Sequence, residues 1–261
     1  MSEHDEIDAS RAPLLEHLIE LRRRLLYCIV AIALAFGVSM YFSESIFGFL
    51  AKPLLKAGQG TLVYTQIFEA FFVQVKVSFF AAMMISFPVI ANQLWQFVAP
   101  GLYRKEKKAL LPFLLATPVL FLMGAAMAYY IAIPMALHFL LGFDGMVGGV
   151  KREALPAIGN YLSFVMQFLF AFGLAFLLPV LLMLLERAGI VTRKQLIASR
   201  RYAIVAATAI AAVLTPPDLM SQVLLAVPLI ILYELAIIGI WFTERARSKQ
   251  AAVEEDADVV A

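Results

Sequence analysis

The sequence is poor in charge for its length, and this shortage limits what the chain can be. Only 15% of its 261 residues are Asp, Glu, Lys or Arg, whereas 62% are hydrophobic. Soluble domains carry about 25% charged and about 45–50% apolar residues. A net charge of +2 is also too small to indicate a nucleic acid as a partner. The excess of apolar side chains therefore has to face lipid.

The residues that build common catalytic and metal sites are scarce as well. Cys28 is the one cysteine, so no internal disulfide can form. The three histidines are scattered, and the sequence has no H-E-x-x-H, phosphate-loop or G-x-S-x-G motif. We therefore expect no metal, no cofactor and no enzymatic activity. An intramembrane serine protease with His138 as its base is the weaker alternative, since no serine has a recognisable nucleophile setting.

Long apolar runs take the place of these motifs. About 20 apolar residues cross a hydrocarbon core of ~30 Å as a helix. Six runs are predicted to be membrane helices: about 25–42, 68–98, 109–141, 161–185, 202–214 and 220–242. Prolines interrupt four of the six runs, and intramembrane proline bends a helix. The expected fold is an all-α membrane protein whose six transmembrane helices form a bent, concave bundle.

The positions of the basic residues predict the orientation. Sixteen of the 21 Lys and Arg residues lie in the N-terminal segment, in the 99–108 and 187–201 loops and in the C-terminal tail, whereas the alternate loops hold four. Because cytoplasmic loops carry the excess of Lys and Arg, both termini are predicted to be cytoplasmic. This orientation requires an even number of spans.

Three regions follow from these runs. Residues 1–24 form a cytoplasmic N-terminus whose amphipathic helix begins at Pro13, and no cleavable signal pattern precedes the first span. Residues 25–242 form the transmembrane domain, and residues 243–261 a polar cytoplasmic tail that is expected to be disordered after Arg247. The 202–214 run is short, so it either thins the bilayer with the last span or is shielded by neighbouring helices.

Two acids on the predicted cytoplasmic side are candidate ligand-binding residues. Glu20 lies in the amphipathic helix and Glu106 in the basic 99–108 loop. Two carboxylates suit two guanidinium groups because each accepts a bidentate fork, which lysine cannot offer. Each acid also has a structural alternative. Glu20 could form an ion pair with Arg24, one helical turn away, and Glu106 could reduce the repulsion among its basic neighbours.

Other polar and special residues have a structural explanation beside a functional one. Glu234 lies within the last run, where an acid either bonds to a neighbouring helix or faces a wet cavity. Asp218 is placed to cap the helix that follows it, with Gln222 one turn further. Pro53 is expected to end the short amphipathic stretch 43–50, and Phe97 is an interfacial aromatic residue in its structural interpretation.

Five ordered motifs carry a resemblance to a known family. They are H-L-I-E-L-R-R-R-L (17–25), P-V-I-x-x-Q-x-W-x-F-x-A-P-G-L-Y-x-x-E (88–106), N-Y-L-S-F-V (160–165), A-F-G-x-x-F-x-x-P-V (171–180) and L-T-P-P-D-x-x-S-Q (214–222). Together they resemble the TatC family over nearly the whole chain. The resemblance implies a subunit that recognises twin-arginine signal peptides. Such a subunit exports folded proteins across the bacterial inner membrane, driven by the proton-motive force.

The resemblance also implies roles for individual residues. Glu20 and Glu106 match the acids that read the two arginines. Positions that support binding or assembly in the family are matched by Arg22, Phe97, Tyr103 and Pro53. Asp218 and Gln222 match the motif of the outer turn. The implied partners are the signal peptides, single-span subunits of the TatA/TatB kind, the lipid bilayer and further copies of the chain itself.

One departure from the family pattern concerns the fourth span. Many members carry an acid in F-G-x-x-F-E-x-P, where it contacts a polar residue of a single-span partner, but this chain has Leu177. Glu186 is too near the cytoplasmic end to replace it. The partner is therefore expected to dock by packing alone or through Gln167.

Two alternative functions of other classes stay open on the sequence. A secondary transporter of a small solute would need a polar site near the midplane, and no convincing internal repeat is present. An insertase or assembly scaffold would be indifferent to paired arginines in its client.

Overall fold

The computed structural model describes the backbone of residues 3–102, 111–143, 145–147, 150–152, 155–215 and 219–260. It describes side chains for residues 17–97, 114–143, 155–215 and 219–245. The chain divides into two compact units, the first formed by Met1–Ala51 and Tyr64–Pro118, the second by Lys52–Val63 and Val119–Ala261.

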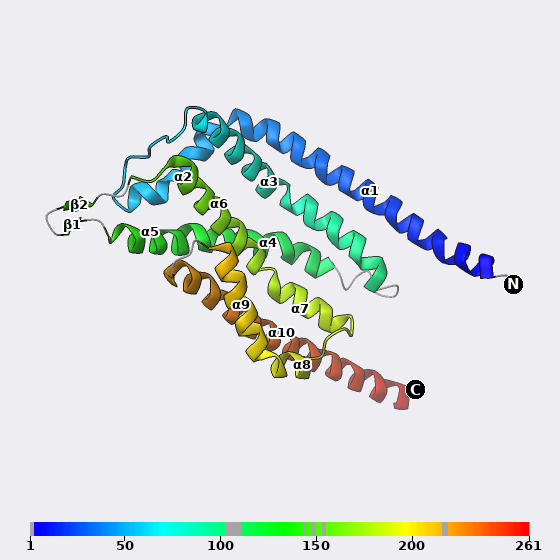
Figure 1. Ribbon diagram of the computed structural model, residues 1–261. Helices are drawn as coiled ribbons and strands as arrows, with labels where there is room; N and C mark the ends of the chain where they lie inside the picture. Colours follow the sequence, from blue (N-terminus) through cyan, green and yellow to red (C-terminus); the bar gives the residue numbers. More distant parts are fainter. Residues whose placement is uncertain are drawn as a thin grey trace. The chain divides into compact units, whose positions relative to one another are not determined.

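Helices make up nearly all of the described chain, which confirms the predicted all-α class (Figure 1). In chain order they are α1 (Glu3–Tyr41), α2 (Ser43–Lys56), α3 (Glu69–Leu102), α4 (Leu111–Met127), the π-helical turn η2 (Ala128–Ala132), α5 (Ile133–Leu141), α6 (Ile158–Ala175), α7 (Leu178–Arg187), α8 (Arg193–Ala198), α9 (Arg200–Leu214) and α10 (Leu219–Val260). A short antiparallel hairpin of β1 (Gly145–Val147) and β2 (Val150–Arg152) was not predicted.

Five helical segments are long and apolar enough to cross a membrane. They are His17–Tyr41, Glu69–Phe97, Leu114–Leu141, Ile158–Arg187 and Leu219–Arg245. Their bounds match five of the predicted spans to within about eight residues at each end. The remaining predicted span, 202–214, corresponds to α9, whose 15 residues would extend over only about 22 Å. The six-span count and the cytoplasmic location of both termini stay predictions with which these helices are consistent.

Three predicted helix ends are wrong. α1 begins at Glu3, ten residues before Pro13, and runs without a break into the first span. α10 continues to Val260, where disorder was expected; the tail contains several Ala and Glu residues, which favour helix. α2 continues through Pro53 to Lys56 instead of ending before the proline.

The end of α2 is set by glycine rather than by Pro53. Gly58 adopts φ +90°, a conformation that glycine reaches without a steric penalty. Its N–H donates to the carbonyl of Leu55, and the N–H of Gln59 donates to that of Leu54, both at 3.2 Å. These two bonds form a Schellman motif, which satisfies the last carbonyls of the helix.

In the first unit, α1 and α3 run antiparallel and side by side (Figure 1). At one end of the contact, the Ser78 hydroxyl lies 3.5 Å from the carbonyl oxygen of Ser39 and donates to that of Gln74 at 2.7 Å. At the other end, Arg24 donates to Gln93. The two contacts are 15 positions apart on each helix, which corresponds to about 22 Å. The two helices therefore keep the same alignment along this length.

In the second unit, α10 packs against α7, α8 and α9. Leu196 of α8 forms a buried cluster with Ile237 and Ile240 of α10. The Tyr233 hydroxyl donates to the Leu196 carbonyl at 2.7 Å, which fixes the short α8 against α10.

The fourth span, α6 and α7, is interrupted at Phe176 and Leu177. Pro179 explains the break because it has no N–H to donate to the carbonyl four residues earlier. α7 ends at a second Schellman motif, with Gly189 at φ +73°.

Two glycines bring α4 and α6 into close contact. A methyl group at Gly124 would overlap the Phe172 carbonyl oxygen, and one at Gly173 would lie 2.6 Å from Cε2 of Phe121. Phe121 and Phe172 are both fully buried, so neither can move aside. Small residues let helices approach closely in membranes, where packing rather than hydrophobic burial drives their association.

We therefore predict that Gly173→Ala destabilises the protein by roughly 1–3 kcal/mol, since overpacking in a filled core has about this cost. Thermal unfolding in detergent should show a midpoint that is lower by about 2–10 °C. Gly37→Ala in α1 is the matched control, because no atom lies within 4 Å of the added methyl group. Equal midpoints for the two variants would show that the α4–α6 contact is not tight.

Candidate functional site

The first unit holds a polar cluster where the N-terminal part of the α1 span meets the C-terminal part of α3. Arg24 donates through Nε to Oε1 of Glu20 at 3.0 Å, and Nη2 contacts the same oxygen. Its Nη1 donates to Oε1 of Gln96 at 2.8 Å and to Oε1 of Gln93 at 3.3 Å. The structural alternative for Glu20, an ion pair with Arg24, is therefore present, and two α3 amides extend it.

An aromatic contact borders this cluster. The ring of His17 stacks on that of Phe97, with centroids 4.3 Å apart and planes inclined by 17°. Nδ1 of His17 lies 4.0 Å from Oε2 of Glu20. The structure thus places Glu20 and Phe97, two of the predicted binding residues, at the same end of the α1–α3 pair.

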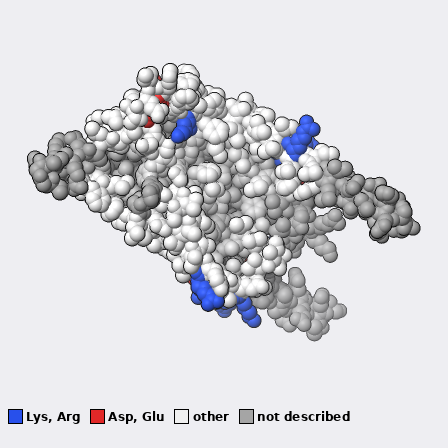
Figure 2. Space-filling view, viewed as in Figure 1, with Lys and Arg blue, Asp and Glu red and all other residues white. Residues whose placement is uncertain are grey.

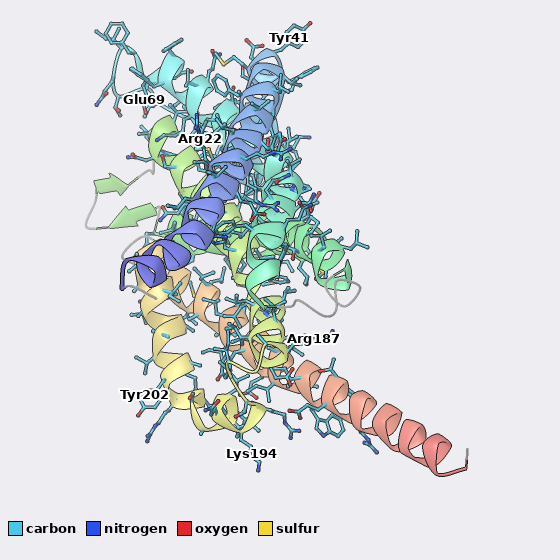
Figure 3. The ribbon with its side chains drawn as sticks, turned by 90° about the vertical axis from the view of Figure 1, so that its right-hand side faces the viewer. Arg22, Tyr41, Glu69, Arg187, Lys194 and Tyr202 are labelled. Atoms are coloured by element: carbon cyan, nitrogen blue, oxygen red, sulfur yellow. The ribbon has the colours of Figure 1, made fainter. Side chains whose placement is uncertain are left out.

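Arg22 does not share this cluster. It is exposed on α1, two residues from Glu20, and residues at that spacing point to different sides of a helix. Figure 3 shows Arg22 on α1, far along the helix from Tyr41. The neighbouring Arg23 is also directed elsewhere, because its Nε donates to the Tyr27 hydroxyl at 3.1 Å.

The structure anchors the same end of α3 on its other side. Trp95 Nε1 donates to Oγ1 of Thr117 on α4 at 2.8 Å. Thr117 is buried, so this bond ties α3 to α4 inside the first unit. It holds the α3 residues that face Arg24 in a fixed position.

Three predicted site residues, Tyr103, Glu106 and Asp218, lie outside the described residues. The predicted proximity of Glu20 and Glu106 therefore remains a prediction. Pro53 is described and is buried within α2. Gln222 lies in the first turn of α10, and its Nε2 is 3.4 Å from the Thr208 carbonyl oxygen of α9.

Glu234 forms an ion pair. Nη2 of Arg200, at the start of α9, donates to Oε2 of Glu234 on α10 at 2.8 Å. The expected alternative of a hydrogen bond to a neighbouring helix is therefore confirmed. Nη1 of Arg193 makes a second cross-link to α10, at 3.2 Å from Oε2 of Glu244.

The α8–α9 end of the second unit is basic. Figure 2 shows that most of the visible described surface is uncharged and that Lys and Arg form a few separate groups, among them one over α1 and one near α8. Arg187, Lys194 and Tyr202 surround this end in Figure 3. The distribution agrees with the predicted cytoplasmic side, since basic residues concentrate there.

Sequence reasoning missed the α3 amides of the Arg24 cluster. Gln93 and Gln96 lie on one α3 face with Asn92, whose Oδ1 accepts a bond from Nε2 of Gln96 at 2.9 Å. The i, i+3 and i, i+4 spacing of these three amides just before a basic loop was the available signal. Among the described side chains, no group of three or more His, Cys, Asp or Glu is placed to hold a metal ion.

Comparisons with known proteins decide the family. Residues 16–228 match the model of the family "Sec-independent protein translocase protein (TatC)". The chain belongs to the TatC family. A TatC from Magnetococcus marinus is 48% identical over 247 residues, which cover 94% of this chain and 90% of that protein. The TatC of Escherichia coli K12 is 40% identical over 233 residues, or 88% of each chain.

Two solved structures are similar over most of this chain. A crystal structure of the twin arginine translocase receptor TatC has a TM-score of 0.75 and 41% identity, covering 85% of this chain and 96% of that one. A crystal structure of the twin arginine translocase receptor TatC in DDM has a TM-score of 0.77 and 40% identity, and the match covers 85% of this chain and 98% of that one.

Membership in TatC fixes the class of function. The chain is a multi-pass inner-membrane subunit of the Sec-independent, twin-arginine protein translocase and not an enzyme. The comparisons give no support to the alternative of a solute transporter.

Glu234 provides a test of that distinction. Because its partner is Arg200 of the same chain and both side chains are about half exposed, the pair should stabilise the fold by less than about 1 kcal/mol. We predict that Glu234→Gln leaves most of the export of a folded reporter protein intact. A double-mutant cycle of Glu234→Gln and Arg200→Gln measures the coupling free energy of the ion pair. Complete loss of export without loss of stability would point to a transport role for Glu234.

Proposed function

We propose that this TatC chain binds twin-arginine signal peptides at the end of the α1–α3 pair that carries Glu20. The observation that carries the proposal is the convergence of acceptors there. One carboxylate and two amide oxygens, from Glu20, Gln93 and Gln96, surround a guanidinium group. The site can therefore bind guanidinium groups, which present several donors in a plane.

Glu106 supplies the second acid in this proposal. α3 ends at Leu102, and Glu106 follows four positions later. A chain of four residues spans at most about 14 Å, so the Glu106 backbone cannot lie further than this from the end of α3. Two neighbouring arginines of a signal peptide can then bind one acid each.

The location of the site supports a receptor role. With both termini cytoplasmic, the predicted six-span topology puts residues 1–24, the α3 end and the tail 243–261 on the side where precursors are made. The apolar segment of the signal would then lie against the concave face that the sequence predicts for the bundle. Export of the folded precursor by the complete translocase is driven by the proton-motive force.

We further propose that a single-span subunit of the TatA/TatB kind docks on α6. Asn160, Gln167, Leu174 and Leu181 are exposed at seven-residue intervals along α6 and α7. Gln167 is thus an exposed amide within a membrane span, and polar groups in lipid associate helices by hydrogen bonds. Leu177, which replaces the family's acid, is half-buried in the same span.

The receptor role predicts the effect of removing both acids. Glu20→Gln combined with Glu106→Gln should abolish recruitment of a twin-arginine precursor, because each charge-assisted contact contributes roughly 1.5–3 kcal/mol. Photo-crosslinking of the precursor to this chain measures recruitment, and membrane fractionation checks that the variant is inserted. Unchanged crosslinking in the double variant would refute the role of the two acids.

Docking on α6 predicts a separate defect. Gln167→Leu should reduce co-purification of the single-span subunit roughly 3- to 10-fold, the equivalent of one interhelical hydrogen bond of about 1 kcal/mol. Asn160→Leu is the control, since Asn160 is also exposed but lies in the first turn of α6. If both variants retain the subunit equally, Gln167 is not the contact.

A further inference from the structure

Arg24 is more fully bonded than a surface ion pair requires. All three of its guanidinium nitrogens contact acceptors, and the acceptors come from two helices. Its side chain is only 18% exposed, compared with 36% for Glu20. The acceptor set of the proposed signal site therefore already holds a guanidinium that belongs to the chain itself.

One acceptor, Gln96, is oriented by a hydrogen bond of its own. Nε2 of Gln96 donates to Asn92, and this bond turns Oε1 of Gln96 toward Arg24. Trp95 and Thr117 hold the same turn of α3 from the other side. The site is thus built to bind a planar group with several donors, in which guanidinium differs from the ammonium of lysine.

Charge makes a second occupant unfavourable while Arg24 stays. Glu20 is the only acid between His17 and Arg24, and Arg22 and Arg23 add two further positive charges. An arginine brought to Glu20 would meet the Arg24 guanidinium at close range, where like charges repel strongly in a partly buried setting.

We propose that Arg24 is an internal occupant of the guanidinium site, which a signal-peptide arginine displaces, and that Gln93 and Gln96 complete the site for the incoming group. The inference rests on the proposed receptor function. Arg24 then competes with the signal peptide for Glu20 and lowers its affinity. Gln96 is a specificity-determining residue. Its Oε1 accepts a hydrogen bond from a second nitrogen of a guanidinium group that already donates to Glu20, and a lysine ammonium has only one nitrogen.

Removing the competitor should strengthen binding. The full-length chain in lipid nanodiscs is titrated with a fluorescent peptide carrying Arg-Arg, and separately with its Lys-Lys counterpart. Arg24→Gln should bind the Arg-Arg peptide roughly 3- to 10-fold more tightly. Arg24→Lys should give an intermediate value, since it retains the charge but loses the fork.

Arg23→Gln is the matched control. It removes the same charge one residue away, but Arg23 donates to Tyr27 and does not contact Glu20. Its affinity should stay within twofold of the unsubstituted chain. Gln96→Leu should weaken binding of the Arg-Arg peptide severalfold and that of the Lys-Lys peptide much less.

The outcomes separate the inference from the function on which it rests. Displacement is supported if Arg24→Gln binds the Arg-Arg peptide more tightly and Arg23→Gln does not. Displacement is overturned if Arg24→Gln has a normal thermal midpoint and binds the peptide with unchanged or lower affinity. If Arg24→Gln lowers the thermal midpoint, Arg24→Lys is used instead, and its affinity for the Arg-Arg peptide is compared with that of the unsubstituted chain in the same way. Equal tightening by Arg23→Gln also overturns displacement, because a general charge effect explains it. If Glu20→Gln has no effect and the peptides bind equally, the receptor function itself fails.

Discussion

Lipid offers no hydrogen bonds, and this constraint determines where the polar groups of the chain lie. In the first unit, Ser78 reaches backbone carbonyls and Arg24 reaches acceptors on two helices, so the α1–α3 pair is bonded at both ends of its contact. In the second unit, Tyr233 bonds to a carbonyl of α8 and Arg200 to Glu234. These polar groups hold each unit together, and in the first unit they lie at the end for which we propose signal-peptide binding.

The Arg24 cluster would combine a structural role with the proposed binding role. Its bonds position the end of α3 against α1, which is a structural role. The same geometry presents a carboxylate and two amides to any guanidinium that can replace Arg24. In the proposed exchange, one guanidinium replaces another, so no acceptor of the cluster is left without a donor.

The sequence predicted the spans well, because the length and apolar character of a run are sufficient to locate a membrane helix. Its motifs predicted the family, which the comparisons confirm. Contacts between distant residues were harder to predict. The Glu234 partner lies 34 residues away on α9, and Arg24 bonds to α3 residues about 70 positions away, so neither pairing has a local signal. Helix ends were wrong where proline or tail composition was given too much weight, as at Pro53, which a helix of several turns can accommodate.

The central claim is that the signal arginines bind between α1 and the end of α3, and mapping of crosslinks tests it most directly. A twin-arginine signal peptide with a photoreactive residue beside its arginines is bound to the translocase, crosslinked and digested for mass spectrometry. We predict crosslinks to residues 17–24 and 92–97. Crosslinks confined to α2, to the β1–β2 hairpin or to the α8–α9 end would contradict the account.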